Sequence, residues 1–266
     1  MKTVIITGGS SGIGQACAFE YGSKGYNVVF TGRNKERMEE TTRMLEDQGT
    51  PCLGMGVDAS TEEGAIDVVR TTVDKFGGID VLICNAGISM RALFEDVDLK
   101  VFEKLMQVNF MGSVYYVKQA LPHLLKSKGT VIAVSSINGH RGTPARTAYT
   151  ASKYAMEGFF EALRTEVMYK GVHVLVVSPG FTGTNIRNTA LTAEGKVQGE
   201  SPRDEGKMMT AAHVAAVIYK GQQKKKRDIV LTTQGKLAVF LNKWIPGTMD
   251  RIVYNVMAKE PDSPFK

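Results

Sequence analysis

Hydrophobic and polar positions follow two different rhythms along the chain. Short, almost continuously apolar runs rich in β-branched residues predict strands that are covered on both faces of a sheet. Longer stretches repeat their apolar residues every three or four positions, which is typical of helices. The predicted strands are 2–7, 26–31, 51–57, 79–84, 129–136, 172–178 and 228–233, and the predicted helices are 12–24, 34–48, 61–76, 98–126, 148–170 and 210–221, with Asn34, Thr61 and Thr210 as N-caps.

The regular alternation of strands and helices predicts an α/β fold. Right-handed crossovers would join the strands into one Rossmann-type, doubly wound parallel sheet of about seven strands with helices on both faces. Residues 1–235 are expected to form this dinucleotide-binding and catalytic domain, in which 181–209 would be a substrate-binding loop or lid. Residues 236–266 are expected to add an amphipathic helical extension to the same domain.

Composition and charge narrow the class of protein. The 266 residues are 43% hydrophobic and 23% charged, as in an ordinary soluble globular domain. Three cysteines without a CxxC pattern favour thiols in a reducing compartment, and four scattered histidines give no metal-ligand spacing, so no metal site is expected. Part of the net charge of +6 lies in the run 224–227, which lacks interleaved aromatic residues and favours a solvated turn over a nucleic-acid patch. Residues 1–14 do not form a signal peptide and no stretch approaches a membrane span, so we expect a cytoplasmic protein.

A glycine-rich turn, TGGSSGIG at 7–14, follows the first predicted strand and opens the first helix. Gly8, Gly12 and Gly14 would let backbone N–H groups approach a pyrophosphate, although the GxxxGxG spacing differs from the commoner GxGxxG fingerprint. Where an acidic residue at the end of the second strand would select NAD, the chain has Arg33. A guanidinium suits a 2′-phosphate, so the sequence predicts NADP in preference to NAD. The alternative is that Arg33 belongs to an exposed first turn of a helix.

The stretch TAYTASK at 147–153 places Tyr149 and Lys153 four positions apart, on one face of a predicted helix. An ammonium beside a phenol stabilises the phenolate, so the pair predicts a tyrosine whose pKa is lowered and which exchanges protons near neutral pH. The alternative is a lysine that lies over a half-buried ring and has no catalytic role.

Six short motifs together resemble the short-chain dehydrogenase/reductase (SDR) family over essentially the whole chain. In chain order they are TGGSSGIG, NAG at 85–87, Asn109, SS at 135–136, YTASK at 149–153 and PG at 179–180. The resemblance implies a nicotinamide-dependent oxidoreductase that acts on a carbonyl or alcohol group.

The resemblance assigns the active site to four residues. Ser136 would bind the substrate oxygen, and Tyr149 would give or take the proton of that oxygen. Lys153 would lower the pKa of the phenol and hold the nicotinamide ribose, and Asn109 would support a water that relays protons to it. Ser135 is the rival of Ser136, which is preferred because its spacing from the tyrosine matches that of the family.

The resemblance also implies a set of cofactor contacts. Asp58 would meet the adenine, and Thr182 and Thr184 would fix the nicotinamide carboxamide unless they are plain loop residues. Because Ser10 and Ser11 provide no basic group in the turn, Arg33 would carry the preference for NADP. The complete set of cofactor residues is Gly8, Ser10, Ser11, Gly12, Ile13, Gly14, Arg33, Asp58, Asn85, Ala86, Gly87, Tyr149, Lys153, Pro179, Gly180, Thr182 and Thr184.

The substrate is the least constrained part of the prediction. Residues 93–125 resemble reductases of lipid-like ketones, including 3-ketodihydrosphingosine reductases, so a hydrophobic ketone such as 3-ketosphinganine leads. The alternatives are a 3-oxoacyl-carrier-protein reductase, a steroid or retinoid dehydrogenase, and a non-catalytic NADP-sensing scaffold, which the intact Tyr149 and Lys153 disfavour. The family further implies a homodimer or homotetramer built through 98–126 and 148–170.

Two amphipathic segments lie in 236–260, on either side of Pro246-Gly247. Basic residues flank both apolar faces. Either the segments cover the substrate cleft or a partner subunit, or they touch a membrane surface and collect a lipid substrate there. The apolar positions are Leu237, Phe240, Leu241, Trp244 and Ile245, then Met249, Ile252, Val253, Val256 and Met257.

Overall fold

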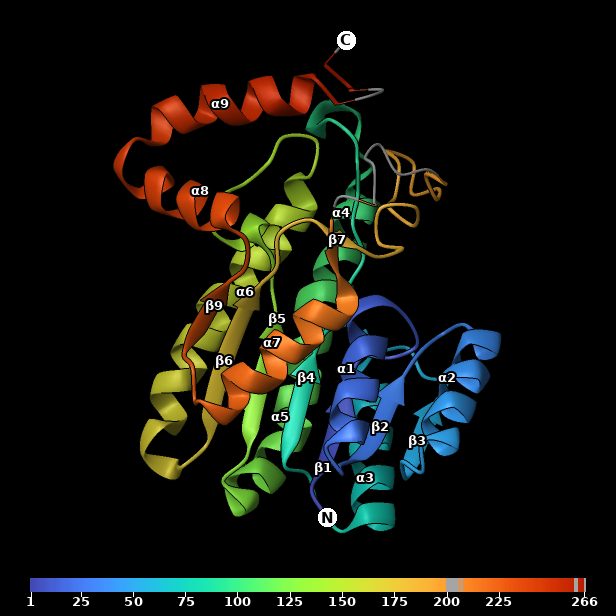
Figure 1. Ribbon diagram of the computed structural model, residues 1–266. Helices are drawn as coiled ribbons and strands as arrows, with labels where there is room; N and C mark the ends of the chain where they lie inside the picture. Colours follow the sequence, from blue (N-terminus) through green and yellow to red (C-terminus); the bar gives the residue numbers. More distant parts are fainter. Residues whose placement is uncertain (200–205, 207, 261–262, 266) are drawn as a thin grey trace.

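The main sheet of the protein consists of the seven apolar runs that predicted strands. The computed structural model describes residues 1–199, 206, 208–260 and 263–265 of the chain. The sheet contains β1 (Thr3–Ile6), β2 (Asn27–Thr31), β3 (Cys52–Met55), β4 (Val81–Cys84), β5 (Thr130–Val134), β6 (His173–Ser178) and β9 (Asp228–Val230). Their order is β3-β2-β1-β4-β5-β6-β9 and all neighbours are parallel (Figure 1). The predicted Rossmann-type fold is therefore confirmed, and its winding reverses between β1 and β4, where such sheets bind ligands.

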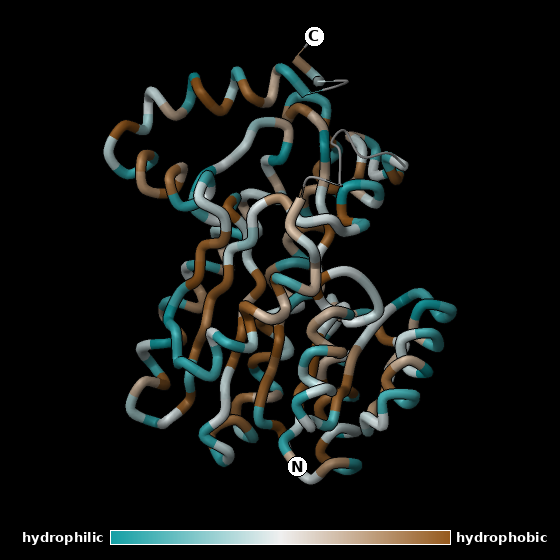
Figure 2. The backbone as a smooth tube through the Cα atoms, in the orientation of Figure 1, coloured by the Kyte–Doolittle hydropathy of each residue, from teal (hydrophilic) through white to brown (hydrophobic). Residues whose placement is uncertain are grey.

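Helices cover both faces of this sheet because its strands are apolar on both sides. On one face lie α1 (Gly12–Ser23), α2 (Lys35–Asp47) and α7 (Ala211–Gln223), and on the other lie α3 (Glu62–Phe76), α5 (Gly112–Ser127) and α6 (Thr147–Val167). Successive side chains of β1 alternate between the two cores, so that Val4 and Ile6 pack in one and Ile5 packs in the other. Figure 2 shows the same segregation, with hydrophobic segments gathered in the strands.

The three predicted N-caps are confirmed. The side chains of Asn34, Thr61 and Thr210 accept hydrogen bonds from backbone N–H groups three residues further on, at 2.8, 3.1 and 3.1 Å. These bonds satisfy donors that the first helical turn leaves without partners, which fixes where α2, α3 and α7 begin.

The helix predicted over 98–126 is observed from Leu99 to Ser127, with an interruption in its winding that the sequence did not predict. The segment divides into α4 (Leu99–Met106), a π-helical turn (Gln107–Met111) and α5. The wider turn lets Asn109 face inward, where it is fully buried. Such π-turns insert one residue without ending the helix, so the apolar periodicity of the sequence does not reveal them.

The predicted lid at 181–209 contains the strands β7 (Thr182–Gly183) and β8 (Met209–Thr210), which pair in parallel. Residues 200–205 and 207 of this prediction lie outside the described residues. After β9 the chain forms α8 (Thr233–Trp244) and α9 (Pro246–Ala258), which project from the carboxyl edge of the sheet (Figure 1). Within the part of the chain that the structure describes, no helix has the length and apolar character needed to cross a membrane.

Candidate active site

The predicted catalytic residues meet at the carboxyl edge of the sheet. Ser136 follows the end of β5, and Tyr149 and Lys153 lie one turn apart on α6. The Ser136 hydroxyl lies near the Tyr149 phenol and favours its charged form, and the Lys153 ammonium lies 5.8 Å from the centroid of the Tyr149 ring. Three of the four residues assigned to catalysis therefore form one cluster around a phenol.

Tyr149 is not acidified in the way that the sequence predicted. Burial raises the pKa of its phenol above the ordinary value, while the Ser136 hydroxyl and the charges of Arg146 and Arg187 act in the opposite direction. The prediction that Lys153 lowers the phenol pKa was therefore wrong for this structure. Desolvation has the largest effect on this pKa, and the groups that oppose it are Ser136, Arg146 and Arg187 rather than Lys153. The groups that favour the phenolate are a serine hydroxyl and two largely buried guanidinium groups.

Lys153 has only 3% of its surface exposed, and its Nζ donates to the carbonyl oxygen of Val134 at 2.9 Å. Nζ also lies 3.4 Å from the sulfur of Met156. Burial lowers the pKa of Lys153 to about 8, against the opposing influence of Glu157 and then Cys84. Burial thus makes the neutral amine easier to reach than in a lysine exposed to water.

Asn109 forms a structural bridge beneath this cluster. Its Oδ1 accepts from the backbone N–H of Ile88 at 2.8 Å, and its Nδ2 donates to the carbonyl oxygen of Ile88 at 3.0 Å. Nδ2 also donates to Ser152 Oγ at 2.9 Å, and Ser152 Oγ donates to the carbonyl oxygen of Tyr149. The side chain therefore ties the π-turn to the chain after β4 and to α6, while its support of a water stays a prediction.

The geometry separates the two candidate serines. Ser136 Oγ accepts from the backbone N–H of Asn138 at 3.2 Å, and its hydroxyl favours the charged form of the Tyr149 phenol. Ser135 Oγ is buried and has no hydrogen-bond partner among the described residues. Ser136 is the serine that the fold presents to the phenol.

The glycine turn has the geometry of a dinucleotide cradle. Gly8 and Gly12 have φ angles of 67° and 56°, a region that favours glycine. A Cβ on Gly14 would overlap the carbonyl oxygen of Gly8, so α1 can approach β1 this closely only with glycine there. The amide of Asn85 donates to the carbonyl oxygens of Thr7 and Gly8 at 3.0 and 3.2 Å and holds the turn against the end of β4.

The N-terminus of α1 fits the phosphates of a nicotinamide dinucleotide. Ser11 occupies the N-cap position but makes no side-chain capping bond, so it leaves the first-turn N–H groups to a ligand. Ser10 and Ile13 lie in the same turn, and the side chain of Thr184 lies within contact distance of the turn at Gly12. Residues 182–184 of the lid therefore reach the same end of the sheet as the glycine turn.

The residues predicted to hold the adenosine follow β2 and β3, and the end of β2 adjoins the glycine turn, where the N–H of Gly9 donates to the carbonyl oxygen of Thr31 at 2.8 Å. Arg33 is exposed there, and Asp58 accepts from the backbone N–H and the hydroxyl of Ser60 at 2.9 and 2.7 Å. Burial opposes ionisation of Asp58, but the bonds from Ser60 and the charge of Arg33 hold the pKa of its carboxyl below the usual value. Arg33, Lys35 and Arg43 line a surface cavity between α2 and β3, which Glu39 and Glu46 share.

The PG motif connects the catalytic loop with the lid. The backbone N–H of Ile137 donates to the carbonyl oxygen of Pro179 at 3.2 Å, beside Ser136. Thr182 uses its hydroxyl to bond the carbonyl oxygen of Gly180 at 3.1 Å. Ala86 and Gly87 lie after β4, where a Cβ on Gly87 would approach the Asn109 amide to 3.2 Å. These backbone segments therefore lie around one end of the sheet, as the resemblance implied.

Several residues near the phenol and the amine were not predicted. They are Arg146, Arg187, His140, Glu157 and Ser178. Glu157 and Arg146 had a signal in the sequence, because Glu157 lies four positions after Lys153 and Arg146 directly precedes α6, three positions before Tyr149. The others come from separate loops and strands, and only the tertiary structure brings them together.

The glycine cradle at the switch point and the Ser-Tyr-Lys cluster beside it define a nicotinamide-dependent oxidoreductase of the SDR class. The chain belongs to the short chain dehydrogenase family, whose pattern it matches over residues 2–195. This family binds a nicotinamide cofactor and acts on small molecules.

Three comparisons illustrate this relationship. The chain is 35% identical to "Dehydrogenase/reductase SDR family member 7B" of Rattus norvegicus, over 98% of this chain and 82% of that protein. It is 37% identical to "11-beta-hydroxysteroid dehydrogenase 1A" of Arabidopsis thaliana, over 74% of this chain and 57% of that protein. A short-chain dehydrogenase/reductase from Burkholderia phymatum, solved in complex with NAD, has the same fold with a TM-score of 0.84 at 20% identity, covering 93% of this chain and 94% of that one.

Proposed function

We propose that this protein interconverts a hydrophobic ketone and its alcohol with NADP(H) as the hydride carrier. The observation that carries the proposal is the grouping of Tyr149, Ser136 and a buried Lys153 at the edge of the sheet that holds the glycine cradle. When bound, the nicotinamide donates or accepts the hydride. Ser136 orients the substrate oxygen, and Tyr149 gives that oxygen its proton or removes it. Lys153 would hold the nicotinamide ribose through its ammonium group.

Ser136, Arg146 and Arg187 give the phenol its acid–base function in this proposal. Each favours the phenolate, so together they oppose the effect of burial when Tyr149 has lost its proton. Arg187 is anchored by a bond from its guanidinium to the carbonyl oxygen of Thr182 at 2.7 Å. The lid would thus contribute to the charge around the phenol as well as to substrate contact.

The preference for NADP over NAD rests on Arg33. It is exposed at the end of β2, close enough to Asp58 to influence its ionisation, and no acidic side chain stands at positions 30–34 to bind a ribose 2′-hydroxyl. The test is the ratio of kcat/KM for NADPH to that for NADH in the wild type and in Arg33→Asp, with Arg43→Asp as a matched control. The proposal expects Arg33→Asp to invert the ratio and Arg43→Asp to change it less, and an unchanged ratio in Arg33→Asp refutes it.

The leading substrate class is a steroid-type ketone, and a long-chain 3-keto lipid such as 3-ketosphinganine is the second. The first is supported by the relative named as an 11-beta-hydroxysteroid dehydrogenase, and the second by the resemblance of residues 93–125 to lipid-ketone reductases. A panel of a steroid ketone, 3-ketosphinganine and a short 3-oxoacyl thioester, followed by NADPH absorbance, separates these classes. The highest kcat/KM on the thioester would contradict both.

We also propose that α8 and α9 touch an anionic membrane surface. Large apolar side chains remain exposed on both helices, so this chain does not bury them over its own cleft. Residues 233–259 contain four basic residues against one acid, Asp250, whose carboxylate is paired with Arg141 at 2.7 Å. Two copies of so basic a surface would repel each other, whereas anionic lipid complements it. The exposed apolar residues are Leu237, Phe240, Trp244, Ile245, Ile252, Tyr254 and Val256.

Flotation with vesicles tests the membrane surface. Wild-type protein should float with vesicles that contain phosphatidylserine, and Phe240→Glu/Trp244→Glu protein should not, while both keep their turnover of a water-soluble ketone. Absence of wild-type binding at low ionic strength, with normal turnover, contradicts the proposal. The homodimer or homotetramer and the cytoplasmic location stay predictions.

A further inference from the structure

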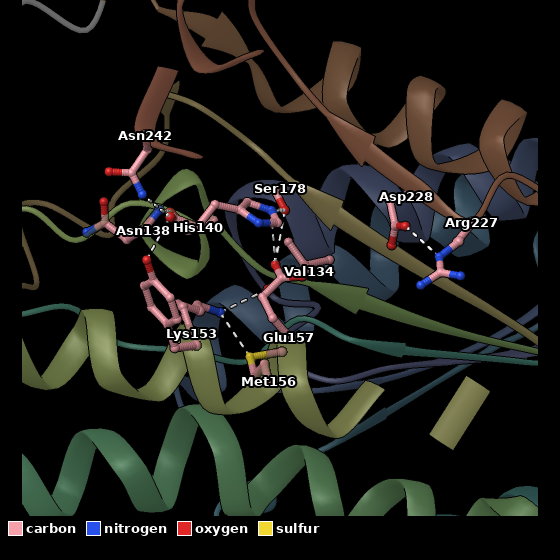
Figure 3. A network of polar contacts seen from close by, with 12 residues as sticks. Val134, Asn138, His140, Lys153, Met156, Glu157, Ser178, Arg227, Asp228 and Asn242 are labelled. Atoms are coloured by element: carbon pink, nitrogen blue, oxygen red, sulfur yellow. Dashed lines mark hydrogen bonds and ion pairs between the residues drawn. The ribbon is translucent and has the colours of Figure 1, made fainter. Parts of the chain in front are cut away.

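A cluster of polar groups lies next to Lys153 and has no part in the reaction described above. Glu157 lies four residues after Lys153 on α6, so both side chains lie on one face of the helix. The Glu157 carboxylate oxygen Oε1 accepts from Ser178 Oγ at 3.2 Å and lies 3.4 Å from Nε2 of His140 (Figure 3). Only 19% of the Glu157 side chain is exposed, so this carboxylate is largely removed from water.

The hydrogen-bond geometry fixes which groups present protons to the carboxylate. Ser178 has one hydroxyl proton, which it donates to Glu157. In the 2.9 Å contact between Ser178 Oγ and His140 Nε2 the imidazole must therefore be the donor. His140 therefore donates to Ser178 and Ser178 donates to Glu157, so the carboxylate is the acceptor at the end of this short chain of hydrogen bonds.

The surrounding backbone holds the cluster in place. The carbonyl oxygen of His140 accepts from Tyr154 Oη on α6 at 2.6 Å. It also accepts from Asn242 Nδ2 on α8 at 3.2 Å (Figure 3). A Cβ on Gly139 would lie 2.9 Å from Cγ and 3.0 Å from Oε1 of Glu157. The glycine leaves the space that the carboxylate occupies, so three elements position one acid beside the lysine.

We propose that Glu157 is a positioning residue that acts through Lys153, with its carboxylate serving as the counter-charge that keeps the lysine an ammonium group. The ammonium then remains directed at the carbonyl oxygen of Val134, on the side of the phenol. The other titratable groups around the pair are Cys84 at the end of β4, Tyr149 on α6, and His140 with Arg141 after β5. Glu157 is the largest influence that opposes the effect of burial on the pKa of Lys153.

The charge of Lys153 can be measured without the reaction. NMR of protein labelled with carbon-13 at the lysine Cε positions reports the protonation of each amine, and the Lys153→Arg variant assigns the signal. Glu157→Gln should lower the titration midpoint of Lys153 by about one pH unit or more. Glu157→Asp, which keeps the charge, should restore most of the midpoint. Glu161→Gln is the matched control, because Glu161 lies one turn further on, is 69% exposed and pairs with Arg227 at 3.3 Å.

An unchanged midpoint in Glu157→Gln overturns the proposal, as does an equal decrease in Glu157→Gln and Glu157→Asp. If Glu157→Gln does not fold, Ser178→Ala is the substitute variant. It should lower the titration midpoint of Lys153 by a smaller amount, and an unchanged midpoint in Ser178→Ala contradicts the proposal. The role in turnover rests on the proposed function and is read from kcat/KM against pH, whose alkaline limb should move with the midpoint. Wild-type protein that titrates as expected but reduces no ketone refutes the proposed function and leaves the charge pairing intact.

Discussion

Replacement of Asn109 by alanine removes only a few atoms, but it should lower the unfolding free energy of the protein substantially. The substitution removes the partners of the Ile88 N–H and C=O groups, which the amide bonds at 2.8 and 3.0 Å. Ser152 loses one partner but keeps its bond to the carbonyl oxygen of Tyr149 at 2.7 Å. Each of the two buried backbone groups that lose their partners costs about 1–3 kcal/mol. Local relaxation recovers part of this cost, so we expect the unfolding free energy to fall by roughly 2–4 kcal/mol.

Urea unfolding followed by circular dichroism measures this loss. Asn255→Ala is the matched control, because Asn255 is exposed on α9 and the same substitution there should change the stability by less than about 0.5 kcal/mol. Activity of Asn109→Ala should fall as well, since the amide supports α6 beneath Tyr149 through Ser152. A loss no larger than that of the control would refute the idea that this amide bridges the π-turn to the chain after β4.

Three further predictions concern glycines and thiols. Gly158→Ala should stabilise the protein by about 0.5–1 kcal/mol in urea unfolding, because alanine favours the helix and a Cβ at this position of α6 meets nothing within 4 Å. A loss of stability would contradict the claim that this position has room for a Cβ. Gly14→Ala should weaken NADPH binding at least tenfold in a fluorescence titration, since its Cβ overlaps the turn at β1, and unchanged affinity would argue against the cradle. Iodoacetamide at pH 8 should label Cys52 first, because burial raises the pKa of Cys84 to about 12 and that of Cys17 further, and both thiols are fully enclosed; equal labelling in peptide mass spectrometry would refute this order.

Local signals in the sequence were sufficient for most of the fold. Asn34 and Thr61 marked true helix starts because an N-cap depends on residues within three positions of it. The apolar runs became strands of a parallel sheet because each is hydrophobic on both faces. Within the helix predicted over 98–126, the π-turn at Asn109 was not predictable, because it accompanies a contact with Ile88, which is distant in the sequence.

The sequence was sufficient to predict which residues form the candidate site, but not how their surroundings shift the pKa values of those residues. The spacing of Tyr149 and Lys153 placed them on one face, as observed. Spacing alone cannot show how much water each group loses, and desolvation turned out to dominate the pKa of both. Glu157 and its partners on β6 and after β5 depend on long-range packing that no short motif records.

The central claim is that Tyr149 moves the proton to and from the substrate oxygen. The most direct test is kcat of Tyr149→Phe with NADPH and the best ketone of the panel, compared with Tyr169→Phe, whose ring is 92% exposed. Loss of the phenolic proton should lower kcat by about 10²–10⁴-fold while NADPH still binds, and the control should keep wild-type turnover. A folded Tyr149→Phe protein that reduces the ketone at the wild-type rate would contradict the account.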